Sequence, residues 1–223
     1  MTGLDRSRPV QALAARGENR HNARVPPVLV DPSRVREFAD LGAFEAWLAR
    51  HHASEPELWI KLHKVGSGLA SISPKEAIDA CLCWGWIDAI RKRFDERSFL
   101  QRYTPRGRKS VWSQINVDNV ARLIAAGRMT PHGLVHVDAA KADGRWDRAY
   151  GGGKDMKIPA DLQAAIDADP RARATFATLS AQNRFALAFQ THNMKTDAGR
   201  RNKIAGFVAM LGRGETPHPQ TKK

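Results

Sequence analysis

Cysteine and tyrosine are scarce in this chain of 223 residues, which has two of each. Cys81 and Cys83 stand two positions apart, and on a helix such a pair points its thiols about 200° from each other. This spacing favours neither a disulfide nor a two-ligand metal clamp. We therefore interpret both thiols as packing residues.

Long apolar runs are also absent from the sequence. No segment approaches the ~20 consecutive apolar residues of a membrane-spanning helix, and residues 1–30 lack the apolar core of a signal peptide. We expect a cytoplasmic protein on these grounds. Because 42% of the residues are hydrophobic, the chain still has enough apolar side chains for an ordinary core.

Acidic residues are outnumbered, with 23 Asp and Glu against 36 Lys and Arg, so that the formal net charge is +13. The excess is concentrated between residues 91 and 116, where eight Lys or Arg face two acids. An anionic partner is one interpretation: nucleic acid, a phosphorylated metabolite or an acidic protein surface. A solvated surface without a partner is the other.

The most distinctive part of the sequence is residues 81–116, here called the basic aromatic stretch. It contains Trp84, Trp86, Tyr103 and Trp112 among many of the arginines. Aromatic rings interleaved with cations can stack bases and bind phosphates. Packing in the core is the competing interpretation; it is favoured for Trp84, while Trp86 and Trp112 fit both.

The spacing of apolar residues predicts an α+β fold, with a small, mainly antiparallel sheet and helices in the N-terminal part and an all-helical C-terminal part. The expected parts are a flexible leader over residues 1–33, an α+β part over 34–116 with the basic aromatic stretch, a helical part over 117–214 and a polar, frayed tail over 215–223. The leader is rich in Pro, Gly, Asn and Arg and has no sustained apolar periodicity, which is typical of flexible segments.

Local patterns predict the elements of the N-terminal part. Apolar residues three and four apart predict a helix from Phe38 to about His51, and alternation over residues 57–65 predicts a strand. Ser73, followed by proline and an early acid, begins a second helix, and Gly85 ends it.

Two further strands and a series of helices complete the prediction. Residues 87–94 and 98–104 are expected to form a hairpin, whose turn lacks Asn-Gly or Asp-Gly, so the register stays open. Helices are predicted from residue 117 to Gly127, from Thr130 to Gly144, and over residues 161–168, 170–189 with a break near Ser180, and 199–211.

Motifs for metal, phosphate-loop and serine chemistry are incomplete. His132 and His136 have the four-residue spacing of a metal pair, but nothing supplies the further ligands that zinc needs, and Gly133 excludes an HExxH motif. Residues 151–154, GGGK, lack the spacing of a phosphate loop and favour a linker, and no serine lies in a GxSxG context. We predict no metal and no cofactor.

Asp88 lies between Trp86 and the cationic run, in a predicted strand. A carboxylate in such a position is costly unless it is paired, and Arg102 or Arg106 can supply the partner. A structural salt bridge is the favoured interpretation, and a catalytic acid or base is the alternative.

Six segments together resemble the YdeI/OmpD-associated family, also labelled bacteriocin-protection proteins. They are CLCWGWID, RFDERSFLQRYTPR, SVWSQIN, VARLIAAGRM, AAKADGRWDRAY and RRNKIAGFVAML, within a resemblance that runs from about Phe38 to Pro219. It implies a cytosolic bacterial protein with a small α+β N-terminal part and a helical C-terminal part, and no established reaction.

The resemblance also marks positions in this chain. Its motif positions are Gly85, Trp86, Ile87, Asp88, Arg102, Thr104, Pro105, Arg106, Trp112, Asn116, Lys141, Gly144, Trp146 and Tyr150. Near the C-terminus, Lys195 and Arg200 fit the family pattern, whereas Gly199 stands where the family tends to have threonine. The two histidines at 132 and 136 fall on no family pattern.

We hypothesise a non-enzymatic protein for stress or envelope protection, against bacteriocins or antimicrobial peptides, that binds an anionic small molecule or protein partner. The expected ligand-binding residues are Trp86, Asp88, Arg102, Tyr103, Arg106, Trp112 and Asn116. One alternative is an enzyme with Asp88 as acid or base and the arginines as an anion clamp. A second is weak nucleic-acid binding without sequence preference, since alternation puts Arg91 and Arg93 on the sheet face opposite Lys92.

Overall fold

The computed structural model describes residues 28–152 and 156–220, so most of the predicted leader lies outside the described residues. The elements in order are a 3-10 turn η2 (Pro32–Arg34), β1 (Val35–Arg36), α1 (Leu41–His51), β2 (Leu58–His63), α2 (Pro74–Cys83), β3 (Trp86–Arg93), β4 (Ser98–Pro105), α3 (Gln114–Ala125), α4 (Pro131–Ala142), α5 (Ala160–Asp167), α6 (Pro170–Ala177), α7 (Ala181–His192) and α8 (Asp197–Gly212). The predicted α+β class is confirmed.

The sheet has the strand order β1-β2-β4-β3. Strand β4 pairs antiparallel with both β2 and β3, which confirms the hairpin, and β1 pairs parallel with β2. Strand β1 was not predicted, because two residues are too few for an alternation pattern. The sheet is therefore mainly antiparallel, as the sequence indicates.

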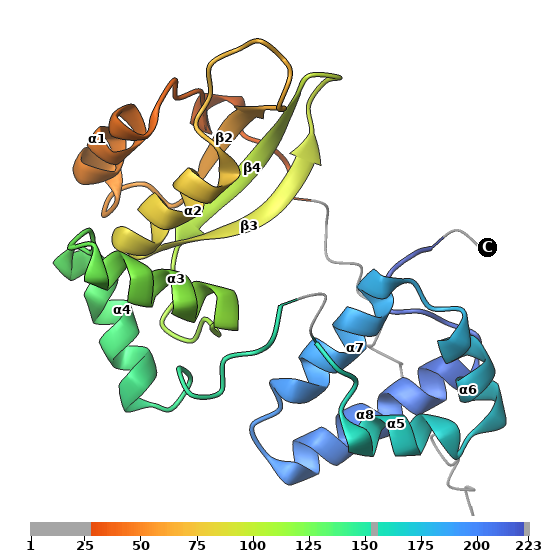
Figure 1. Ribbon diagram of the computed structural model, residues 1–223. Helices are drawn as coiled ribbons and strands as arrows, with labels where there is room; N and C mark the ends of the chain where they lie inside the picture. The colour runs from red at the N-terminus through yellow and green to blue at the C-terminus, as the bar shows by residue number, and fades with distance from the viewer. Residues whose placement is uncertain (1–27, 153–155, 221–223) are drawn as a thin grey trace, which may run out of the picture.

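Helices α1 and α2 pack on one face of the sheet (Figure 1). Alternation in β2 directs Leu58, Ile60 and Leu62 into this core, where they join apolar side chains of both helices. Helix α2 begins with the predicted cap: the Ser73 amide donates to the Glu76 carboxylate at 2.8 Å, and the Glu76 amide donates to the Ser73 hydroxyl at 3.2 Å.

Helices α3 and α4 form a second cluster with α2 (Figure 1). Its buried residues are Leu82, Cys83, Trp112, Val120, Leu123, Val137 and Ala140. The last four helices, α5 to α8, bury a separate cluster around Leu162, Ile166, Leu187 and Leu211. The segment predicted as one helical part, residues 117–214, is thus divided between two hydrophobic clusters.

The polar tail after Gly214 is held in place through residue 220, so the expectation that it frays is wrong for this segment. The side-chain amide of Asn183, which is fully buried, donates to the His218 carbonyl at 3.1 Å and to Gln220 Oε1 at 2.7 Å. The His218 amide donates back to Asn183 Oδ1 at 2.8 Å. A polar tail can be ordered when a buried amide needs its hydrogen bonds.

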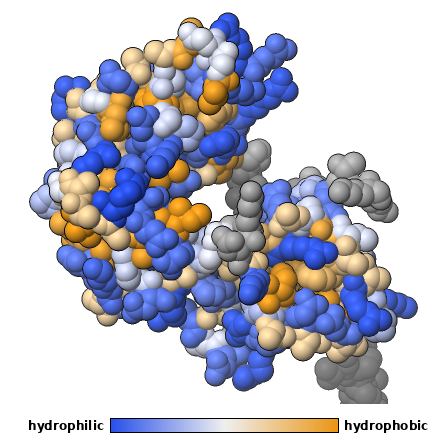
Figure 2. All heavy atoms as spheres, viewed as in Figure 1, coloured by the Kyte–Doolittle hydropathy of each residue, from blue (hydrophilic) through white to orange (hydrophobic). Residues whose placement is uncertain are grey.

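Hydrophilic side chains cover much of the face seen in Figure 2. Within the described part of the chain, no helix combines the length and the apolar character needed to cross a bilayer.

Candidate functional site

Two of the motif segments meet at the end of α2, where Gly85 connects the helix to β3 and contacts the end of β4. Gly85 has φ +73°, and its carbonyl accepts a hydrogen bond from the Arg106 amide at 2.8 Å. A Cβ on Gly85 would lie 2.7 Å from both the His132 carbonyl oxygen and His136 Cδ2. Glycine is therefore required here by its backbone conformation and by the close approach of α4.

Near Gly85 lies a buried charged residue, Arg106. Its side chain is buried, with 4% of the residue exposed, and its guanidinium lies 3.8 Å from the Trp112 ring centroid. Nη1 donates to the Val111 carbonyl at 3.2 Å, whereas neither Arg106 Nη2 nor Trp112 Nε1 has a partner among the described residues. Burial lowers the pKa of Arg106 to about 10, so the group is still charged at neutral pH.

Asp88 lies at a β-bulge on β3. Two residues separate Asp88 from Arg91, whereas one separates their partners Tyr103 and Gln101 on β4. The Asp88 side chain is in contact with solvent, yet the dense protein around it raises the pKa of its carboxyl, although the Arg106 charge opposes the rise.

The predicted salt bridge from Asp88 to Arg102 or Arg106 is wrong. Arg102 instead donates to Glu57 at 2.6 Å, because it points to the sheet face opposite Tyr103. Arg106 forms no ion pair with any described residue and stacks on Trp112. Asp88 and Arg106 influence each other electrostatically without a direct contact.

Two tyrosines border this cluster. Tyr103, the β4 partner of Asp88, is fully buried and its hydroxyl has no partner among the described residues, and burial raises its pKa. The Tyr150 amide donates to the Trp112 carbonyl at 3.0 Å, and its ring packs edge-on against Phe189 of α7 at 4.8 Å. Burial, and then the Asp88 charge, raise the pKa of Tyr150.

Of the seven predicted ligand-binding residues, the structure pairs Asp88 with Tyr103 across β3 and β4 and stacks Arg106 on Trp112. The Asp88 and Arg106 charges link the two pairs. The other three lie in different surroundings. Trp86 is buried and donates its indole N–H to the His52 carbonyl at 3.0 Å, Arg102 pairs with Glu57, and Asn116 lies in the first turn of α3.

The two histidines of the four-residue motif have different neighbours. The His132 ring lies 4.1 Å from that of His52, while His136 faces Gly85. Burial, followed by the charges of Arg106 and Arg145, lowers the pKa of His136. Over residues 28–152 and 156–220, no three His, Cys, Asp or Glu side chains are grouped to hold a metal ion.

A cavity of about 330 Å³, here called the basic hollow, is lined in part by Val111, whose carbonyl accepts the hydrogen bond from Arg106 Nη1. It is lined by Lys109, Val111, Asp143, Arg145, Arg148, His192, Asn193, Met194 and Lys195. Sequence reasoning did not place these residues in a site. The motif around Trp146 and Tyr150 was the available signal, because Arg145 and Arg148 lie within it.

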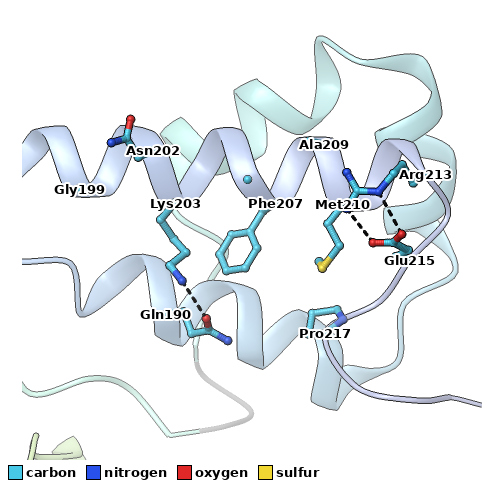
Figure 3. Close-up of a pocket in the computed structure, with 11 residues that line it drawn as sticks. Gln190, Gly199, Asn202, Lys203, Phe207, Ala209, Met210, Arg213, Glu215 and Pro217 are labelled. Atoms are coloured by element: carbon cyan, nitrogen blue, oxygen red, sulfur yellow. Dashed lines mark hydrogen bonds and ion pairs between the residues drawn. The ribbon is translucent and has the colours of Figure 1, made fainter. Parts of the chain in front are cut away.

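A larger groove of about 960 Å³ lies on α8, between it, α7 and the tail (Figure 3). Its floor includes Phe207 and Met210, and it contains none of the predicted site residues. Its cations have partners: Lys203 donates to Gln190 at 3.4 Å, and Arg213 pairs with Glu215 at 2.7 Å. The motif segments therefore favour the Arg106 cluster and the basic hollow as the candidate site.

Comparison with known families divides the chain in the same way as its packing. Residues 36–136 match a family model described as a domain of unknown function (DUF8412), and residues 155–214 match one described as bacteriocin-protection, YdeI or OmpD-associated. No curated protein and no solved structure matches the chain. Most of the motifs that suggested the resemblance lie before residue 155, but the segment RRNKIAGFVAML lies within the second match. The resemblance is confirmed over residues 155–214, which match the model of the YdeI/OmpD-associated, bacteriocin-protection family.

Proposed function

We propose that this protein binds an anionic ligand at Arg106 and Trp112 and serves stress or envelope protection in the cytoplasm. The observation that carries the proposal is the buried guanidinium, which has no counter-ion among the described residues. A buried charge is costly unless it is paired. A bound anion would supply the missing counter-ion.

The unpartnered donors support this assignment. Arg106 Nη2 and Trp112 Nε1 belong to one stacked pair, and both can only donate hydrogen bonds. Buried polar atoms in folded proteins nearly always have a partner, so an acceptor is expected beside them. An anionic oxygen satisfies both the charge and the hydrogen bonds.

A second candidate function is catalysis with Asp88 as acid or base. The raised pKa of its carboxyl favours this role, since a carboxyl that ionises closer to neutral pH transfers protons more effectively. Arg106 is then the anion clamp. Binding remains the first proposal, because it needs only the Arg106 and Trp112 geometry.

The test compares two indole deletions in the full chain. Trp112→Phe removes the N–H beside Arg106 and keeps a ring for stacking, whereas Trp59→Phe removes an equally buried, unpartnered indole N–H on the sheet. We expect inorganic phosphate, at constant ionic strength, to raise the Tm of wild type and Trp59→Phe alike. The rise should be smaller in Trp112→Phe and smallest in Arg106→Gln. Equal rises in all four proteins would exclude this site.

The protective role requires a cellular test. A bacteriocin-sensitive strain producing the wild-type chain should survive bacteriocin exposure better than one producing Arg106→Gln at the same level. Equal survival with both proteins would show that protection does not require the binding site at Arg106. Equal survival with and without the wild-type chain would reject protection itself.

A further inference from the structure

The basic hollow is built from both parts of the chain. Lys109 and Val111 come from the loop after β4, Arg145 and Arg148 from the turns after α4, and Lys195 from the loop between α7 and α8. His192 and the Arg148 carbonyl join the two parts through a hydrogen bond of 3.1 Å from Nε2 to the carbonyl oxygen. The edge-on packing of Tyr150 on Phe189 lies at the same junction.

Only part of the positive charge of the basic hollow is engaged in ion pairs and hydrogen bonds within the protein. Arg145 donates through Nε to both Asp143 oxygens at 2.8 Å and through Nη1 to the Ser110 carbonyl at 2.7 Å. Asp143 is the one acid among the lining residues. Lys109 and Lys195 form no hydrogen bond or ion pair through their side chains with residues 28–152 or 156–220.

Arg148 is also available to a ligand. Its Nη2 donates to the Asp143 carbonyl at 3.2 Å, which fixes the guanidinium at the rim and leaves its other N–H groups for an acceptor. Lys109, Arg148 and Lys195 therefore surround one cavity with three cations whose charges are not balanced there. Such convergence of like charge lowers the energy of a bound anion and raises its local concentration.

We infer that the basic hollow is a binding site for a small multivalent oxyanion, carrying two or more phosphate or carboxylate groups. The volume is at the lower end of the range of about 300 to 1,000 Å³ found for small-molecule sites, which favours a small ligand. Three cations on different segments suit a ligand with several anionic groups better than a ligand with a single anionic group. Arg106 is not among the residues that line this site, although its Nη1 donates to the carbonyl of Val111, which is one of them.

The experiment is isothermal titration of the full chain with pyrophosphate, citrate and orthophosphate at low, constant ionic strength. Lys195→Ala and Arg148→Ala each remove one cation of the hollow, and Arg173→Ala removes an exposed cation on α6 as the matched control. We expect pyrophosphate or citrate to bind more tightly than orthophosphate. Affinity should fall about 10-fold or more in each hollow variant, as expected for loss of a charged hydrogen bond, and stay unchanged in Arg173→Ala.

The comparison of probes identifies the chemistry. Tighter binding of pyrophosphate assigns the hollow to phosphate groups, and tighter binding of citrate assigns it to carboxylates; both support a multivalent oxyanion site. Absence of binding by any probe, or equal weakening in the hollow variants and Arg173→Ala, overturns the inference. Arg106→Gln should keep the wild-type affinity for the multivalent probe that the hollow binds most tightly, whereas its binding of orthophosphate should weaken, so the hollow is tested separately from the proposed function.

Discussion

At the scale of single residues, the sequence singled out Asp88, Arg106 and Trp112 as candidate site residues but did not determine how these residues pair. The unpredicted step is the register of β4, which puts Tyr103 opposite Asp88 and turns Arg102 to the other face, where Glu57 lies. A shift of one residue would have reversed these neighbours. The turn of the hairpin contains no residue pair that specifies its register, so the sequence alone could not decide.

His136 gives a prediction about pH. Burial and the charges of Arg106 and Arg145 lower its pKa in the folded protein below the ordinary value. The unfolded chain then binds more protons than the folded one as the pH falls below about 6.5, so acid removes stability. We expect the free energy of unfolding to decrease less between pH 7 and pH 5 in His136→Gln than in the wild type.

Nuclear magnetic resonance checks the cause of this pH dependence directly. The His136 ring should titrate with a midpoint below about 6.5 in the folded protein. A midpoint above that value would show that burial and the neighbouring cations do not control the pKa of His136.

At the scale of elements, the sequence predicted the caps of α2 and α4 correctly but began α1, α3 and α8 two or three residues from their observed starts, and it did not predict the close contacts between helices. Thr130 caps α4 as expected, but its hydroxyl also donates to the Cys83 carbonyl at 2.6 Å, which fixes α4 against the end of α2. Gly133 stands where a Cβ would lie 2.4 Å from the Cys83 carbonyl oxygen. The sequence shows a glycine in a helix, but not the neighbour that requires it.

A matched pair of glycine substitutions tests this contact. Gly133→Ala should lower the free energy of unfolding by about 1–3 kcal/mol, because the added methyl forces α2 and α4 apart. Gly206→Ala, in the interior of α8 with no atom within 4 Å of the new Cβ, should leave it unchanged or raise it by up to about 1 kcal/mol. Urea unfolding measures both free energies. Equal effects would show that the close approach of α2 does not exclude a side chain at position 133 of α4.

At the scale of the whole molecule, the sequence predicted a small sheet followed by helices, but not how the helices divide. Helices α3 and α4 join the core of α2, and α5 to α8 enclose their own. Amphipathic patterns show which face of a helix is buried and do not identify the partner that buries it. The basic hollow lies where the two parts meet, so its residues from positions 109, 148 and 195 could not be grouped from sequence.

We propose that Arg106 is kept buried for an anion and contributes little to folding. Unfolding of Arg106→Met and wild type by urea, each with and without inorganic phosphate, tests this most directly. Replacing an unpaired buried cation with an apolar side chain of similar length should change the ligand-free stability by no more than about 1 kcal/mol in the unfavourable direction, while phosphate should stabilise the wild type more than Arg106→Met. A loss of about 3–5 kcal/mol without phosphate, as in a broken buried ion pair, or equal stabilisation of both proteins by phosphate, would contradict it.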